Sequence, residues 1–432
     1  MGFFQKLFSF RKSGPEDVEF SILLSNKFDI VGTAKEVERI KDPLKRIYQT
    51  TEGRALLDSL SVEPKTKIIA DFNEKGADAC HSHHAIYLRS FYMSTIYHEL
   101  IHEHQEQNNA VADCAVLPED AFLFNAMSEM DATINTECGI LRDFIEKDST
   151  QLNVFKNDDK SDMGFLYHTF LSQKQTNPNL SDEEALLTAK GALAMRYLDQ
   201  TKETKKQMDK LKLAHPDWSI EAIKDSILNN QDSDMSKSEK GHRRCIMNWF
   251  FAYEEEFNQQ RNYALSGYPK TDRLVMFDYY KKRLNLSCHY DDIFNQFFDT
   301  KIRTEQIDEN TKCILKDGKP VVRIQKTEKG KEVSFFHENS DKVKYKRLEK
   351  KDGRFVIDEF DRNCGKKIQE GEMLHGLFIK SARYYESGAV RSRSEYKNGE
   401  LVNTVYYDEK RRKDSSVNNT ISTVIGRSRM LR

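Results

Sequence analysis

The sequence predicts an α+β protein in three parts, namely a mixed domain, a helical middle region and an antiparallel β meander. Two short strands followed by a long amphipathic helix predict the mixed domain, which we place at residues 21–155. Apolar residues at helical spacing fill residues 156–305, and short alternating stretches separated by Gly-containing turns follow over residues 312–410. An N-terminal segment (1–20) and a tail (411–432), expected to be disordered, complete the predicted organisation.

Composition and charge narrow the class of protein. The formal net charge of −1 provides no global field for nucleic acid, so no nucleic-acid partner is expected. No apolar run reaches the ~18–20 residues that cross a membrane, so no transmembrane segment is expected. Seven scattered cysteines without a CxxC pair predict reduced thiols and a cytoplasmic location. Gln5 and Lys6 interrupt the N-terminal apolar residues, which argues against a cleavable secretory signal; export without such a signal stays open.

Two strands and a helix are predicted near residue 100. Apolar and β-branched residues bounded by polar segments predict strands at residues 67–73 and 85–89, the second of them at the edge of its sheet. A helix should follow over residues 93–109, with Ser94 or Thr95 as its N-cap. Its apolar face comprises Ile96, Tyr97, Leu100 and Ile101.

This helix carries the HExxH pattern in His98, Glu99 and His102. Residues i and i+4 lie on one helix face, so both imidazoles can bind one Zn²⁺. Glu99 then lies beside the metal, where it can act as the general base that activates a water molecule. Two strands followed by such a helix are the order expected of zincin proteases, in which an edge strand pairs with an extended polypeptide. The pattern therefore predicts a zincin-like domain with a zinc cofactor.

A catalytic zinc site needs a third protein ligand. Gln105 stands where metzincins have glycine, so the ligand should come from the next helix, predicted over residues 118–147. Asp131 projects from the apolar stripe of that helix, whereas Glu129 points toward a second, partly apolar side. Periodicity alone favours Asp131, with Glu129 and then Glu137 or another acid as the alternatives.

The same residues resemble those of the glutamate-ligand zincins, and more closely a bacterial metallopeptidase-type domain family of unknown function. The resemblance rests on the HExxH residues and on Glu129-Met130-Asp131-Ala132, which is similar to the Glu-Ala-Asp-Ala segment of such domains. It covers roughly residues 45–150, and Met130 departs from the small residue of the family. By this resemblance Glu129 would be the third zinc ligand and Asp131 would orient one of the histidines.

Further histidines lie on both sides of this motif. The segment Cys80-His81-Ser82-His83-His84 offers zinc ligands, but it lacks the paired spacing of a closed structural site. We expect a polar loop, with lining of the cleft and a metal site as the alternatives. His104 lies about 200° around the helix from His102, so it should be exposed.

Five helices are predicted between residues 160 and 300. They cover residues 161–174, 181–211, 219–229, 237–262 and 271–284. Ser181 and Glu184 have the spacing of a capping box at the start of the second helix. A zincin-like domain needs a second subdomain to close its cleft, and these helices are the natural source. The residue that stabilises the oxyanion should also come from them, with Tyr167, His168 and Tyr197 as candidates.

The C-terminal part predicts a β meander with an internal repeat. Turns are expected at Asp317-Gly318, Asp352-Gly353, Ser387-Gly388 and Asn398-Gly399, between strand-like stretches such as residues 321–324, 333–336, 355–357 and 394–396. Aromatic residues recur at steps of 24, 25 and 22 residues, at Phe336, Phe360, Tyr385 and Tyr407. Residues 380–410 resemble the MORN-like repeats of bacterial antitoxin-component proteins, in which hairpins stack into an elongated sheet.

These patterns lead to one functional expectation and two alternatives. We expect a zinc metallopeptidase that hydrolyses peptide bonds of a polypeptide substrate, with Glu99 as general base. The first alternative is a non-catalytic interaction protein with a zincin-like fold, and the second is a zinc hydrolase of a non-peptide bond. The β-repeat module would bind a protein partner, a substrate protein or a membrane surface.

Overall fold

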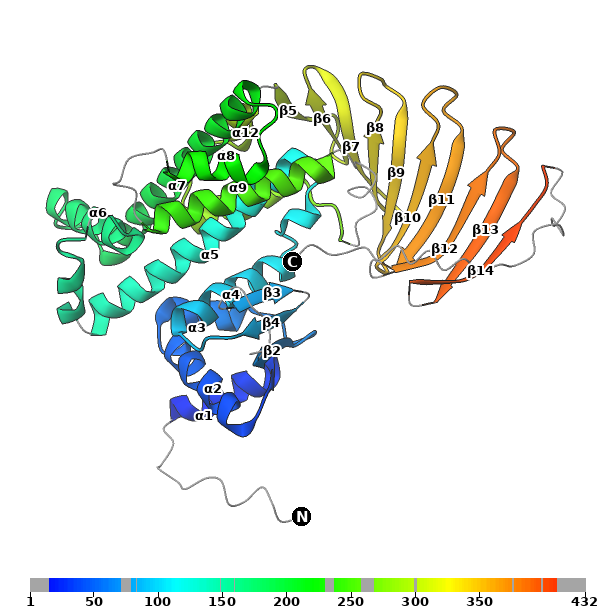
Figure 1. Cartoon of the computed structure of the whole chain (residues 1–432). Coiled ribbons are helices and arrows are strands. Elements are labelled where there is room, and N and C mark those ends of the chain that lie inside the picture. Colours follow the sequence, from blue (N-terminus) through cyan, green and yellow to red (C-terminus); the bar gives the residue numbers. More distant parts are fainter. Residues whose placement is uncertain are drawn as a thin grey trace, which may run out of the picture. The chain divides into compact units, whose positions relative to one another are not determined.

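The computed structural model describes residues 15–70, 79–82, 84–147, 149–158, 160–229, 237–257, 268–298, 301–374, 377–397 and 399–409. The chain forms two compact units, one of residues 1–263 and 270–299 and the other of residues 264–269 and 300–432 (Figure 1). The first unit combines the two regions that the sequence analysis separates after residue 155. The tail predicted as disordered lies outside the described residues.

The first unit begins with a small α/β subdomain. Its elements are α1 (Pro15–Lys27), β1 (Phe28–Val31), α2 (Ala34–Tyr48), α3 (Thr51–Ser59), β2 (Thr66–Ala70), β3 (Ala79–Ser82), β4 (Ala85–Leu88) and α4 (Met93–Gln107). Within the described residues the sheet has the order β1-β2-β4-β3. Strands β1, β2 and β4 are parallel, whereas β3 runs antiparallel to β4.

The predicted strands are confirmed over residues 67–70 and 85–88, but the predicted edge position is wrong. Strand β4 pairs with β2 on one side and with β3 on the other, so within the described residues the edge strands are β1 and β3. Strands β1 and β3 were not predicted; each has four residues, and the Cys80-His81-Ser82 segment of β3 is polar. Strand β4, which precedes the HExxH helix in the chain, therefore lies inside the sheet, and its neighbour β3 lies at an edge.

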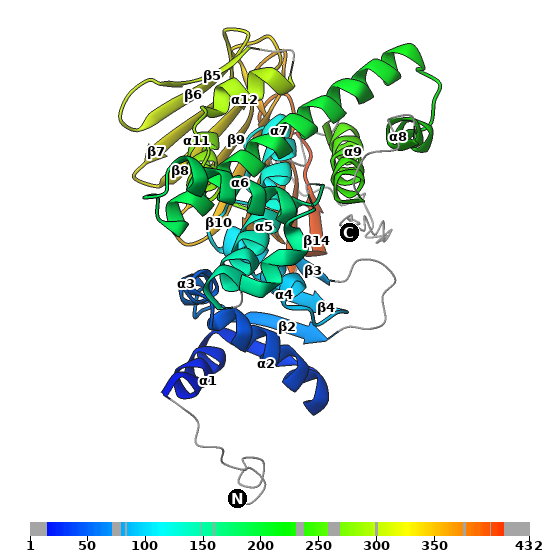
Figure 2. The same ribbon diagram turned by 90° about the vertical axis from the view of Figure 1, so that its left-hand side faces the viewer.

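Helix α4 packs with its apolar face against this sheet. The four predicted apolar residues are confirmed as buried, namely Ile96, Tyr97, Leu100 and Ile101. In both views the helix lies between the sheet and α5 (Pro118–Lys147), consistent with its contacts to β3, β4 and α5 (Figure 1 and Figure 2). The predicted N-cap is wrong, because Tyr92 caps the helix without a side-chain hydrogen bond and the hydroxyl of Thr95 accepts from Ser90 instead.

The rest of the first unit is helical. After η1 (Ala112–Cys114) and α5 come η2 (Ser149–Phe155), α6 (Asp162–Thr176), α7 (Asp182–Ala214), α8 (Ile220–Asn229), α9 (Lys237–Phe257), α11 (Arg273–Leu284) and α12 (Tyr290–Phe297). The five predicted helices are confirmed over the described residues, and the Ser181–Glu184 capping box is present. Helix α5 contacts α4, α6, α7, α9 and α11. Among the described residues, no helix is both long and apolar enough to span a bilayer.

The second unit contains one antiparallel sheet. Its strands are β5 (Ile302–Gln306), β6 (Thr311–Lys316), β7 (Lys319–Thr327), β8 (Gly330–Phe336), β9 (Val343–Lys350), β10 (Arg354–Phe360), β11 (Lys367–Leu374), β12 (Leu377–Tyr384), β13 (Val390–Lys397) and β14 (Glu400–Tyr406). As far as the structure describes the chain, each strand pairs with the next, so the predicted meander is confirmed. The sheet begins at Ile302, however, and the helical prediction up to residue 305 is wrong at its end.

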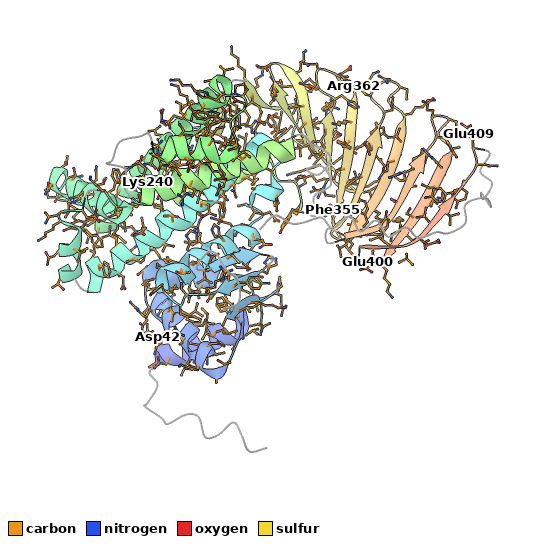
Figure 3. All side chains as sticks on the ribbon, in the orientation of Figure 1. Asp42, Lys240, Phe355, Arg362, Glu400 and Glu409 are labelled. Carbon is orange, nitrogen blue, oxygen red and sulfur yellow. The ribbon has the colours of Figure 1, made fainter. Side chains whose placement is uncertain are left out.

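The predicted repeat corresponds to one β-hairpin. Phe336 and Phe360 end β8 and β10, while Tyr385 and Tyr407 directly follow β12 and β14, so one step of the repeat spans two strands. The hydroxyl of Tyr385 donates to the carbonyl of Tyr407 at 3.0 Å and thereby links neighbouring repeats. Phe355 of β10, labelled in Figure 3, forms a small buried core with Ile357 of the same strand and Met373 of β11.

Replacing Ile68 by alanine tests the core beneath the HExxH helix. Ile68 has no exposed surface, so the truncation should lower the free energy of unfolding of the first unit by about 2–5 kcal/mol. The exposed Ile22 is a matched control, since the same truncation there should change stability by at most about 0.5 kcal/mol. Urea denaturation followed by tryptophan fluorescence reports on this unit, because Trp218 and Trp249 both belong to it. An equal loss of unfolding free energy in the two variants would contradict the placement of Ile68 in this core.

Candidate metal centre

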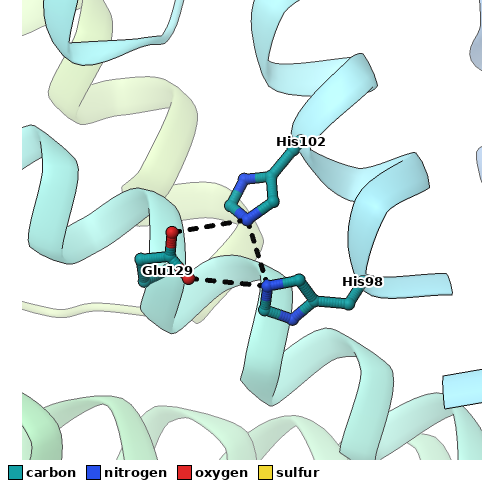
Figure 4. Close-up of side chains that lie close together, drawn as sticks. All are labelled: His98, His102 and Glu129. Carbon is teal, nitrogen blue, oxygen red and sulfur yellow. Dashed lines mark hydrogen bonds and ion pairs between the residues drawn. The ribbon is translucent and has the colours of Figure 1, made fainter. Parts of the chain in front are cut away.

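Helices α4 and α5 bring three potential ligand residues together. His98 and His102 lie one turn apart on α4, with their Nε2 atoms 3.1 Å apart. Glu129 of α5 faces them, with Oε2 3.5 Å from His98 Nε2 and Oε1 3.6 Å from His102 Nε2 (Figure 4). Ligand atoms bound tetrahedrally to one zinc ion lie about 3.3–3.6 Å apart. The three residues thus form a group that could hold a metal ion.

The side chain of Gln105 determines which nitrogen of His102 faces this group. The amide nitrogen of Gln105 donates to Asp131 Oδ2 at 2.8 Å and to the Ser128 carbonyl at 2.9 Å, so its Oε1 must face the other way. This oxygen lies 2.8 Å from His102 Nδ1 and accepts its hydrogen. In the neutral ring the lone pair then stays on Nε2, the atom that faces Glu129.

The two acids between which the sequence left the third ligand open have different partners. Glu129 reaches both histidines, whereas Asp131 is fully buried and accepts hydrogen bonds from Arg283 Nε of α11 at 2.7 and 2.8 Å. The preference for Asp131 from periodicity is therefore not met, because a basic partner on another helix holds its carboxylate. Asp131 contacts His102 only through Gln105.

Glu137, the further alternative, does not belong to the ligand group. It lies two turns along α5 from Glu129 and lines the same cavity. Burial, together with the charge of Asp162, raises the pKa of Glu137 to about 7. Because Glu129 and not Glu137 has its carboxylate beside both histidines, the structure favours Glu129.

Burial and charge oppose each other in the metal-free ligand group. Burial by itself favours the neutral form of His102, but the Glu129 carboxylate outweighs it and raises the pKa of His102 to about 9. Burial also favours the protonated form of Glu129, yet the charges and hydrogen bonds of His102 and His98 lower the pKa of that carboxyl well below its usual range. Without a metal, His102 consequently holds a proton at neutral pH, and a metal ion must displace it.

The ligand group opens into a cavity of about 730 Å³. Strand β3, helix α4, the segment around residues 111–113 and helix α5 contribute its walls. Glu99 is one of the lining residues, and it is only 7% exposed and is not part of the ligand group. Small hydroxyl side chains contribute much of the remaining lining, namely Ser94, Thr95, Ser128, Thr133 and Thr136. The cavity therefore combines three ligand atoms with a separate carboxyl group and a polar wall.

The histidines outside the HExxH pattern differ from expectation. Residues 79–82 form strand β3, so the predicted polar loop is wrong there, and His83 lies outside the described residues. Cys80 and His81 line the cavity, which agrees with the cleft-lining alternative. His104 is partly buried rather than exposed, because its Nδ1 lies 2.7 Å from the hydroxyl of Tyr279. Burial and the nearby Arg283 lower the pKa of His104 to about 4.

The candidates for oxyanion stabilisation are not among the residues that line the cavity. Tyr167 is buried in the helical core, where its ring contacts Phe155 and His168. Tyr197 donates a hydrogen bond of 2.5 Å from its hydroxyl to Asp162. Sequence pattern could not place these side chains, since the helices that carry them meet only in the tertiary structure.

Two residues that complete the site were not identified as such from the sequence. Gln105 was noted only as a departure from the metzincin pattern, although its position three residues after His102 places it within reach of that ring. Arg283 carries no local signal at all, because its partner Asp131 lies 152 residues away.

Comparisons with known proteins add little to this geometry. No protein-family model matches the chain, and no significant match is found among curated proteins. One crystal structure of TarM matches 32% of the chain and 24% of its own length at 14% identity, with a TM-score of 0.15. A structure of an S. aureus TarM mutant in complex with fondaparinux, alpha-GlcNAc-glycerol and UDP matches 31% of the chain and 23% of its own length at 13% identity, with the same TM-score of 0.15. The chain thus spans about a quarter of these structures, and likeness at this level carries no conclusion about fold or activity.

Two substitutions on α5 separate the candidate third ligands. Glu129→Gln should lower the zinc content by about one ion per chain, because the amide removes the anionic ligand. Asp131→Asn keeps all three ligand atoms and should weaken affinity only about 10–100-fold through the Gln105 link. Elemental mass spectrometry and chelator competition on proteins with native circular dichroism measure both effects. If Asp131→Asn lost its zinc while Glu129→Gln kept it, the third ligand would be Asp131 rather than Glu129.

Metal affinity should depend on pH. Because the pKa of His102 in the metal-free protein is raised to about 9, each metal ion must displace a proton at any lower pH. The apparent affinity should therefore rise about tenfold per pH unit for each proton displaced, and fall correspondingly on acidification. Competition with a chromophoric chelator between about pH 6 and pH 8 gives this slope. A flat profile would show that His102 does not take part.

Proposed function

We propose that the chain is a zinc-dependent metallopeptidase with a zincin-like first unit. The observation that carries this proposal is the convergence of His98, His102 and Glu129 beside the carboxyl group of Glu99 in one cavity. Three nitrogen and oxygen ligands with room for a further one are the donor set of catalytic zinc sites. The cavity is large enough to admit part of a peptide chain, and its wall is polar.

Each residue has a separate part in the proposed reaction. His98, His102 and Glu129 would hold the zinc ion, which would supply Lewis-acid chemistry by polarising a carbonyl group and acidifying water. The carboxylate of Glu99 accepts a proton from the attacking water and then passes it to the leaving amine. Gln105 keeps the ring of His102 in the orientation that presents Nε2.

The edge strand supports a peptide as the substrate. Of the two edge strands that the structure describes in this sheet, β3 lines the cavity, through Ala79, Cys80 and His81. An extended peptide can add to such an edge through main-chain hydrogen bonds, which every polypeptide offers. A small non-peptide substrate would gain nothing from this edge, so the geometry favours peptide hydrolysis over the cleavage of another bond.

The C-terminal sheet supports a binding role in the same proposal. Among its described residues no group with the geometry of a metal site occurs, so the chemistry belongs to the first unit. We propose that its MORN-like hairpins bind a protein partner or the substrate protein. This module is also what supports the second candidate function, a non-catalytic interaction protein.

Glu99→Gln separates the two functions. Removal of the general base should lower peptide cleavage by about 10²–10⁴-fold while the bound metal is retained, because Glu99 is not in the ligand group. Cleavage of a quenched fluorescent peptide library and of unfolded proteins measures activity, and elemental analysis measures metal. Glu38→Gln, which changes an exposed carboxylate of α2, is the matched control and should keep full activity.

Two results would count against the peptidase. A zinc-loaded wild-type protein that cleaves no peptide or unfolded protein would favour the interaction protein instead. Cleavage that persists unchanged in Glu99→Gln would remove this residue from the mechanism.

A further inference from the structure

We propose that the chain has a second metal site, made by His81 of β3 together with Glu103 and Glu106 of α4. These residues form another group whose ligand atoms all lie within 4.8 Å of one another. The group shares no residue with His98, His102 and Glu129. The proposal concerns metal binding and the anchoring of β3, and it does not depend on the peptidase activity.

The geometry of His81 points to an ion rather than to a simple hydrogen bond. Its Nε2 lies 2.8 Å from Glu103 Oε2 and 3.3 Å from Glu106 Oε2. A ring nitrogen carries either one hydrogen or one lone pair, so it cannot satisfy two carboxylates equally. One metal ion between the three atoms can satisfy all of them. The 3.3 Å separation matches that of ligand atoms around one zinc ion, whereas the 2.8 Å separation is that of a direct hydrogen bond and would lengthen when an ion binds.

Burial and charge support the same conclusion. The side chain of Glu103 has no exposed surface, and those of Glu106 and His81 are only 8% and 9% exposed. Two carboxylates buried side by side are costly unless positive charge balances them. Within the described residues the ion pairs of Glu103 are made with His81 and His84, and none is made with lysine or arginine. A divalent cation would balance both carboxylates at once.

His84 supports the site from the other side of Glu103. Its Nδ1 lies 3.0 Å from Glu103 Oε1, the oxygen that does not face His81. Carboxylate ligands are commonly oriented in this way by a neighbouring side chain. Imidazole and carboxylate together suit a first-row divalent ion, of which zinc is the one that the neighbouring group would also take.

The position of the site indicates its role. Glu103 directly follows His102, so α4 carries ligands for both groups on adjacent faces, and the rings of His81 and His102 lie 6.5 Å apart. Strand β3 has only four residues and pairs with β4 on one side. An ion bound by His81 and the two glutamates would fix this short strand to α4 beside the cavity.

Metal counting tests the proposal. The purified full-length protein is stripped with chelator, reloaded with excess zinc, desalted and analysed by elemental mass spectrometry. We expect about two zinc ions per wild-type chain, about one in His81→Gln and Glu106→Gln, about one in His98→Ala, and none in His98→Ala/Glu106→Gln. A zinc content that is the same in wild type, His81→Gln and Glu106→Gln would overturn the second site. If the second group binds zinc and the first does not, the zinc content of His98→Ala would instead equal that of the wild type.

Stability provides a readout that is independent of the count. In the His98→Ala background, where the first group is disabled, zinc should raise the melting midpoint by about 5 °C. The additional change Glu106→Gln should abolish this rise, whereas Glu38→Gln in the same background should leave it intact. A rise that persists with Glu106→Gln would overturn the proposal, because the ion would then bind elsewhere.

Discussion

The hydrogen-bonded link from His102 through Gln105 to Asp131 and Arg283 is the interaction on which the site depends. It joins α4, α5 and α11 by buried polar contacts. Arg283 orients the carboxylate of Asp131, Asp131 orients the amide of Gln105, and Gln105 orients the ring of His102. Because Asp131 and the Ser128 carbonyl take the amide hydrogens of Gln105, only its oxygen remains for His102. The direction of one imidazole is thus determined by an arginine on a different helix.

The same link explains why two neighbouring acids of α5 have different roles. The charge of Arg283 holds Asp131 in the interior, and Glu129, two residues earlier on the helix, is left to face the histidines. A buried carboxylate whose two oxygens share the N–H of one arginine is costly to redirect, so this ion pair leaves Glu129 as the acid that faces the histidines. Packing of α4 on the small sheet supports this arrangement, since the residues opposite the histidines are fully buried.

Helix α4 also connects the cavity with the edge of the sheet. One of its faces presents His98 and His102, and the next presents Glu103 and Glu106 to the histidines of β3 and its turn. The edge strand therefore contacts the helix through charged groups and not only through its ladder with β4. This explains how a strand of four residues can form a wall of the cavity.

Local patterns predicted most of the elements. The HExxH spacing, the helix of residues 118–147, the hairpin turns at Gly318 and Gly353 and the aromatic repeat all depend on residues close together in the chain, where periodicity and turn chemistry are reliable. Strands β1 and β3 and helices α1, α2, α3 and α12 escaped prediction, and the two strands and α12 have only four and eight residues over which a period could emerge.

The sequence by itself determined which residues of α4 could bind a metal and that helices and a β meander follow. Only the tertiary structure decided which acid of α5 faces the two histidines, that β3 rather than β4 lies at an edge of the sheet, and that His81 contacts Glu103. Each of these outcomes depends on contacts between residues that are distant in the chain, and no local periodicity contains them. The orientation of a polar side chain in a protein interior follows its partner, and the partner is known only once the chain has folded.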